Sequence, residues 1–151
     1  MLEVVDRHQN LADDIDAVRM AAWLHDAVYD PRASDNEERS AALSDDPEVR
    51  RLVLLTKTHD PQPGDRNGEL LCDADLAILA ADPAAYREYA GNVREEYAFV
   101  PPEAFREGRG RILEDLLAKA ALYKIVPQRD EWTSRAHANL RDELRTVTGA
   151  P

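Results

Sequence analysis

The chain has 151 residues, of which 44% are hydrophobic and 32% charged, and this composition is typical of one globular domain over residues 1–151. A single cysteine, Cys72, excludes an internal disulfide, and the first residues lack the pattern of a signal peptide, so we expect a cytoplasmic protein. The formal net charge of −11 disfavours nucleic acid as a partner, and no apolar run is long enough to span a bilayer. A phosphorylated substrate would need a local cation, either a basic cluster or a metal ion.

Capping residues and turn-forming residues divide the chain into helices. Aspartate followed by proline, as at Asp46-Pro47 and Asp82-Pro83, supplies a side-chain cap and a residue that fits the first helical turn. Ser34 and Glu37 have the spacing of a capping box. No segment alternates as a strand does, so we expect an all-α helical bundle. The expected helices cover about residues 15–29, 35–43, 47–58, 69–81, 83–98, 102–120 and 129–147.

His25 and Asp26 are the first candidates for chemistry. His25 shares one face of the expected helix 15–29 with apolar residues such as Val18 and Ala21, and Asp26 is turned from it by about 100°. An imidazole and a carboxylate at the edge of a buried face can converge on one ion. The ordinary alternative is a core histidine bonded to a backbone carbonyl beside a solvated aspartate, and for an isolated pair that alternative is preferable.

Asp75 changes this balance. Leu71, Ala74, Ile78 and Leu79 form an apolar stripe at offsets of zero, three, seven and eight, and Asp75 takes the missing offset of four. A buried carboxylate needs a metal, a cation or a proton. A buried Asp–Arg pair or a helix cap is the alternative, but His25-Asp26 offers a partner, which favours the metal-ligand interpretation. Asp73 falls off the stripe, where it would face solvent or support the site.

Two further candidates, Lys57 and His59, lie at the C-terminal end of the helix predicted over 47–58. His59 extends its inward face at the C-terminal end, where it would contact a phosphoryl oxygen, bind a second metal or only cap the helix. Lys57 would neutralise phosphate charge, although a solvated lysine is the more common finding. A general base would come from the acids after His25-Asp26, and Glu37 among them already has a place in the capping box. These acids are Asp30, Asp35, Glu37 and Glu38.

Two segments resemble the HD superfamily: AAWLHDAVYD at residues 21–30 and LCDADL at residues 71–76. More narrowly, NEERS at 36–40 and TKTHD at 56–60 are similar to a bacterial group described as predicted metal-dependent HD phosphohydrolases. The resemblance covers nearly the whole chain, out to Asn139-Leu140. The His-Asp dipeptide alone is weak evidence, whereas the ordered set across several helices is much stronger.

This resemblance implies a divalent metal ion, such as Mn²⁺ or Mg²⁺, bound by His25, Asp26 and Asp75. It also implies a second-metal or phosphate-contacting role for His59. The family's first histidine usually lies upstream in an Arg-x-x-His-x-x-x-His run, and His8 falls too late to match it. We therefore expect this chain to lack the family's first helix, and apolar surface left uncovered there would favour self-association, for example as a homodimer.

The leading functional hypothesis is hydrolysis of a small phosphorylated metabolite or nucleotide. Asp26 or a nearby acid would take a proton, and His59 or Lys57 would stabilise developing charge. The alternative is a non-catalytic helical module with a degenerate metal site. A third hypothesis, an oxidative enzyme with two irons, needs more ligands than the sequence places.

Overall fold

The computed structural model describes residues 1–149, and in that range it contains helices and no strand. The all-α prediction is therefore confirmed. Contacts divide the chain into two compact units, which are described separately below. Unit 1 contains Met1–Ala77 together with Tyr123–Pro127, and unit 2 contains Ile78–Leu122 together with the chain from Gln128 onward. None of the helices in the described range combines the length and the apolar character needed to cross a bilayer.

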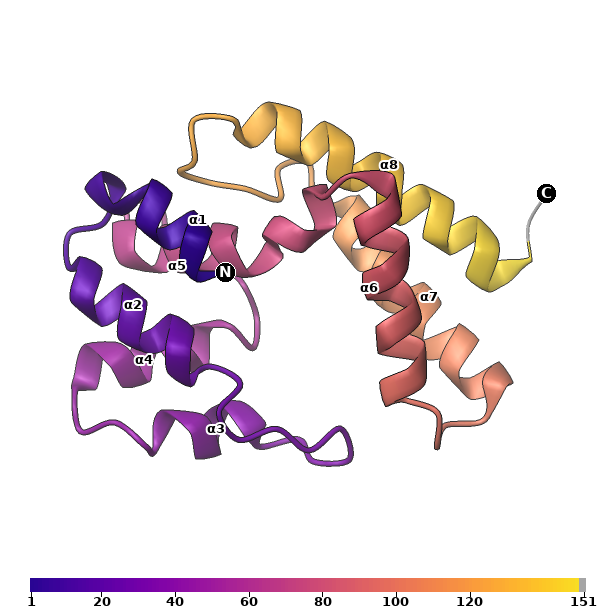
Figure 1. The fold of residues 1–151 in the computed structure, drawn as a ribbon, viewed down its shortest axis with the longest axis horizontal. Coiled ribbons are helices and arrows are strands. Elements are labelled where there is room, and N and C mark those ends of the chain that lie inside the picture. The colour runs from indigo at the N-terminus through magenta and orange to yellow at the C-terminus, as the bar shows by residue number, and fades with distance from the viewer. Residues whose placement is uncertain (150–151) are drawn as a thin grey trace. The chain divides into compact units, whose positions relative to one another are not determined.

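Unit 1 is built on α2, α4 and α5, which pack against one another around a core that includes Val18, Leu52 and Leu71 (Figure 1). The short helix α1 packs on α2 and α5, and α3 packs on α4. The elements of this unit are α1 (Leu2–Arg7), η1 (Gln9–Leu11), α2 (Ile15–Leu24), α3 (Asn36–Ala41), α4 (Pro47–Leu55) and α5 (Arg66–Asp75), and the turn η2 (Leu76–Ala80) leads out of it.

Aspartate caps begin most of these helices. The Asp14 side chain accepts a hydrogen bond from the backbone N–H of Ala17, and Asp46 accepts from Glu48 and Val49. The capping box predicted at Ser34 is wrong, because Asp35 is the N-cap of α3 and makes no side-chain cap. The neighbouring Asn36 instead bonds back to Asp30, which closes the preceding loop.

Helices α4 and α5 approach each other closely at Gly68. A Cβ atom added there would meet the Asp65 carboxylate and lie 2.7 Å from Leu55 Cδ2, so a larger residue would have to displace one of these side chains. Beside this contact, the buried Asn67 accepts from the backbone N–H groups of Asp13 and Asp14 and donates to Glu48. Asn67 thus ties the start of α2 to α4 and α5.

Glu48 makes the stability of this unit depend on pH. Its hydrogen bond with Arg51 is the main reason why its pKa falls from 4.5 to about 2, with a smaller contribution from Asn67. Because the folded pKa lies below the usual one, this stabilisation is complete above about pH 4.5 and is lost as the pH falls through about 2. We expect the urea midpoint to fall over that window, and to fall less in Glu48→Gln. If the urea midpoint fell with pH as steeply in Glu48→Gln as in the wild type, the pH dependence could not be assigned to Glu48.

Unit 2 contains three long helices, α6 (Pro83–Glu96), α7 (Pro102–Ala118) and α8 (Arg129–Thr148). Helix α8 packs along α7 and also contacts α6 (Figure 1). Asp82 caps α6 as predicted, and the buried Asn139 of α8 donates to the carbonyls of Leu79 and Ala81 just before that cap. The three helix ranges agree with the predicted ranges to within about two residues.

Candidate functional site

His25 lies at the C-cap of α2, in unit 1, and its ring orientation is set by the backbone. Nδ1 lies 2.9 Å from the carbonyl oxygen of Ala22, which can only accept, so Nδ1 carries the proton of this hydrogen bond. Nε2 therefore remains as the ring nitrogen that faces the carboxylates. It lies 3.1 Å from Asp26 Oδ2 and 3.5 Å from Asp75 Oδ1.

Asp75 joins both histidines of the cluster. Its Oδ1 faces His25, and its Oδ2 lies 2.7 Å from His59 Nε2. Asp75 is the last residue of α5 and its side chain is 23% exposed, so it lies at the rim of the core and not in the middle of the core face, where the stripe placed it. Helix α5 changes into the tighter turn η2 directly after Asp75, which moves the following residues off the α-helical stripe.

Asp26 lies 3.1 Å from His25, just beyond the end of α2. The helix was expected to continue to Tyr29, but it ends at Leu24, and His25 and Asp26 lie in the turn that follows. The Asp26 side chain is 68% exposed, so it is the member of the cluster that solvent reaches best.

The charges in this cluster stabilise one another. Burial lowers the pKa of His25, but hydrogen bonds to Asp26 and Asp75 outweigh it and raise the pKa to about 10. Burial acts to raise the pKa of Asp75, and its bonds to the two imidazoles lower it instead. The raised pKa of His25 stabilises the fold fully below about pH 6.5, and this contribution is lost as the pH rises through about 10.

His59 occupies an unusual backbone position. Its φ of 50° lies in the left-handed region, and its N–H donates to the carbonyl of Leu55 to close the end of α4. Glycine is the usual residue at such a position, because a Cβ atom there costs about 1–2 kcal/mol. Residues held in such conformations are concentrated at functional sites. The left-handed turn aims the imidazole of His59 at Asp75.

Lys57 and Glu37 lie together but do not contact this cluster in the described part of the chain. Lys57 Nζ donates to Glu38 at 2.6 Å and to the carbonyl of Ser34 at 3.0 Å, and Glu37 lies 3.9 Å from it. These bonds join α3 to the turn after α4. The catalytic roles expected for Lys57 and Glu37 stay predictions.

Asp73 is fully buried, so the solvent-facing alternative is wrong. Its carboxylate accepts three backbone hydrogen bonds, from Lys124, Ile125 and Val126, at 2.7, 2.8 and 3.0 Å. The stripe argument failed because α5 is buried on both sides, with segment 123–127 packed over the face that was expected to meet water.

Ser40 is a supporting residue that the sequence did not indicate. It is fully buried in α3, and its hydroxyl accepts from the N–H of Val28 and donates to the carbonyl of Val28. Ser40 thereby holds the segment that follows His25-Asp26. No sequence signal marks this residue, because a serine inside a short polar helix is usually solvated.

The chemistry of these donors fits a divalent metal. Two ligands about 2.1 Å from one ion lie about 3.0–3.4 Å apart at octahedral or tetrahedral angles, close to the 3.1 and 3.5 Å around His25 Nε2. Imidazole with carboxylate is a common ligand set. Within residues 1–149, however, no three His, Cys, Asp or Glu side chains are already arranged as a metal site. The side chains of His25, Asp26, His59 and Asp75 are instead paired with one another.

Comparisons with protein-family models, with curated proteins and with solved structures find no match for this chain. The case for its function therefore depends on the residues described above.

Proposed function

We propose that this protein is a metal-dependent phosphohydrolase whose site is formed by His25, Asp26, His59 and Asp75. The observation that supports it most is the meeting of three acceptor atoms. His25 Nε2 in its neutral form, Asp26 Oδ2 and Asp75 Oδ1 all have lone pairs, and the two carboxylate oxygens lie 3.1 and 3.5 Å from the imidazole nitrogen. Only a cation between them satisfies all three, either a proton on the imidazole or a metal ion.

The surroundings of this group support the metal alternative. The Nδ1–H of His25 is anchored on the Ala22 carbonyl, a backbone support that metal-binding imidazoles commonly have. The side chains of His25 and Asp75 are 16% and 23% exposed, which is open enough for an ion to enter and closed enough to limit competition from water. His25, Asp26 and Asp75 would hold the ion, with His59 beside them.

A divalent ion held by His25, Asp26 and Asp75 would supply Lewis acidity, which would lower the pKa of water and offset the charge of a phosphoryl group. Asp26, the most exposed carboxylate, accepts the proton of the attacking water. The water oxygen bonds to phosphorus, the P–O bond to the leaving group breaks, and that group's oxygen takes a proton from solvent. His59, whose Nε2 is bonded to Asp75, would stabilise the developing negative charge.

The substrate class in this proposal is a small phosphorylated metabolite or nucleotide. A chain with a net charge of −11 is poorly suited to a polyanionic nucleic acid. Lys57 is two residues from His59 and would add positive charge, provided that it leaves Glu38 when the substrate binds.

We expect the full chain with Mn²⁺ to release inorganic phosphate from at least one member of a panel of nucleotides and phosphomonoesters. Asp75→Asn should lower that rate by about 100-fold or more, because it removes the carboxylate that joins both imidazoles. Asp45→Asn is the matched control, since Asp45 is exposed and should keep the full rate. No phosphate release from any substrate, or equal rates for Asp75→Asn and wild type, would refute the proposal.

The second candidate is a helical binding module that retains a metal without catalysis. The observation that favours it is that the side chains of the cluster are already paired with one another, an arrangement that stabilises unit 1 without any reaction. Phosphate release separates the two candidates, because an ion that binds the folded state raises the melting temperature in both cases. A rise with Mn²⁺ that Asp75→Asn removes, without phosphate release, would select the binding module.

A further inference from the structure

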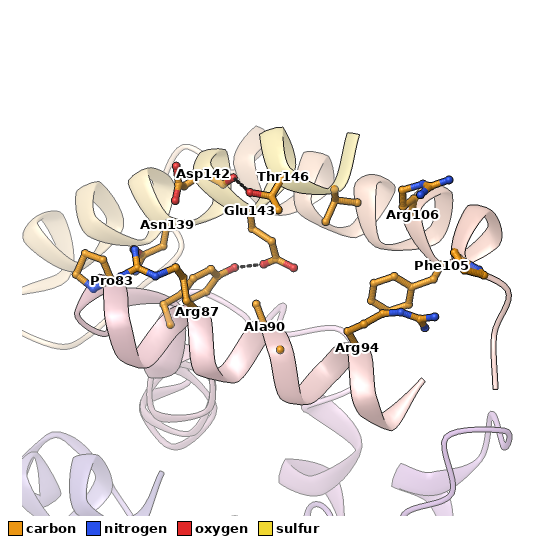
Figure 2. A pocket seen from close by; sticks show the side chains of 14 residues that line it. Pro83, Arg87, Ala90, Arg94, Phe105, Arg106, Asn139, Asp142, Glu143 and Thr146 are labelled. Carbon is orange, nitrogen blue, oxygen red and sulfur yellow. Dashed lines mark hydrogen bonds between the residues drawn. The ribbon is translucent and has the colours of Figure 1, made fainter. Parts of the chain in front are cut away.

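Unit 2 contains a pocket that lies outside the cluster around His25. Its volume is about 470 Å³, and α6, α7 and α8 form its walls (Figure 2). Small-molecule sites in proteins typically have volumes of about 300–1,000 Å³. The α6 wall is a single helix face, since Pro83, Tyr86, Arg87, Ala90, Gly91 and Arg94 follow one another at helical spacing.

The interior of the pocket is mainly apolar. Ala90 of α6, Phe105 of α7 and Val147 of α8 contribute carbon surface from the three helices. Gly91 has no side chain, and nothing lies within 4 Å of where its Cβ would be, which leaves the pocket open along α6. An apolar group of a ligand would be removed from water here.

Three arginines give the lining a positive character. Arg94 is half-buried, lies over the Phe105 ring at 4.6 Å and donates to the carbonyls of Tyr97 and Val100, so its guanidinium is held in place. Arg87 and Arg106 are exposed, and neither forms an ion pair in the described part of the chain. Figure 2 shows Arg94 and Arg106 at the same end of the pocket as Phe105.

The two acids that line the pocket are already paired. Glu143 forms a two-bond ion pair with Arg109, which is not one of the lining residues, and Asp142 lies 3.1 Å from Arg145. The arginines are therefore uncompensated within a protein whose net charge is −11. Uncompensated cations beside an apolar cavity favour a ligand that carries a negative charge on an apolar body.

We propose that this pocket binds a small amphipathic anion, such as a medium-chain carboxylate, with its headgroup toward Arg94 and Arg106 and its apolar body along Ala90 and Gly91. The probe is decanoate, used below the concentration at which it forms micelles. Calorimetric titration of the full chain should give saturable binding of one decanoate per chain. Decanol, which has the same chain without the charge, should bind at least about tenfold more weakly.

Two glycine substitutions locate the binding. Gly91→Phe should fill the pocket and weaken decanoate binding at least about tenfold, whereas Gly108→Phe should leave it unchanged. Both glycines lie within helices, both have open space where a Cβ would be, and only Gly91 lines the pocket. Folding is preserved in this pair, because replacing a helical glycine generally favours the helix.

A second pair of variants tests the charge. The double substitution Arg87→Gln with Arg106→Gln should weaken decanoate binding, while Arg50→Gln with Arg141→Gln should not. Both doubles lower the net charge by the same amount, and Arg50 and Arg141 are exposed residues outside the lining.

No saturable binding of decanoate, equal weakening by Gly91→Phe and Gly108→Phe, or decanol bound as tightly as decanoate would each overturn the proposal. Equal effects of the two double substitutions would also overturn it, because they would show that only the net charge of the protein attracts decanoate.

Discussion

Replacing Arg109 by methionine is expected to lower the free energy of unfolding by about 3–5 kcal/mol. Arg109 is 8% exposed, and its guanidinium donates to both carboxylate oxygens of Glu143 at 2.7 and 3.0 Å. Tyr86 donates its hydroxyl to the same carboxylate. The variant would leave Glu143 as a buried charge without its cation, which is costlier than the loss of the attraction itself.

Urea unfolding followed by circular dichroism measures this effect. Arg111→Met is the matched control, because Arg111 lies on the same helix in an exposed ion pair with Glu107 and its loss should change stability by less than about 1 kcal/mol. A triple variant, Arg109→Met with Glu143→Leu and Tyr86→Phe, should recover most of the stability, since no polar group of the network then remains buried. Similar losses for Arg109→Met and Arg111→Met would show that the buried pair contributes no more than a surface pair.

Asp73→Ala is the second substitution with a large expected effect, a loss of about 3 kcal/mol or more. The carboxylate of Asp73 holds three consecutive backbone N–H groups, those of Lys124, Ile125 and Val126. Without it these donors lose their partner, and the Val126 hydrogen bond is fully buried. Each unsatisfied buried donor costs about 1–3 kcal/mol.

Two further variants test this explanation. Asp73→Asn keeps one oxygen acceptor and should lose less than Asp73→Ala, whereas Asp115→Ala on the exposed face of α7 should change stability by about 0.5 kcal/mol or less. Hydrogen exchange should show that the amides of residues 124–126 lose protection in Asp73→Ala. Unchanged protection would mean that Asp73 does not hold this segment.

Local patterns predicted most of the helices well. Asp46 and Asp82 begin α4 and α6 as expected, because an N-cap bonds only to residues two or three positions later and needs nothing from the rest of the fold. Helix ends were less predictable. Helix α2 ends at Leu24, five residues early, and no glycine or proline directly after Leu24 marks that end.

The candidate site was likewise predictable only where it depends on regular helices. Helical spacing was enough to select His25 and Asp75 as inward-facing residues, and the structure places them 3.5 Å apart. Spacing did not predict that α2 would end before His25 and Asp26. It also did not predict that a left-handed residue at His59 would aim its ring at Asp75. Both depend on backbone conformations outside regular helices.

The amino-acid sequence alone determined the helical class, the candidate histidines and carboxylates, and the starts of several helices, although it missed α1 and placed the start of α5 three residues late. These features depend on interactions within one or two turns. Only the tertiary structure decided which aspartate is buried. Asp73 and Asp75 are two residues apart on one helix, and their environments differ because segment 123–127 returns over the first and leaves the second beside two histidines. That return joins residues about fifty positions apart, and the helical period of α5 carries no information about it.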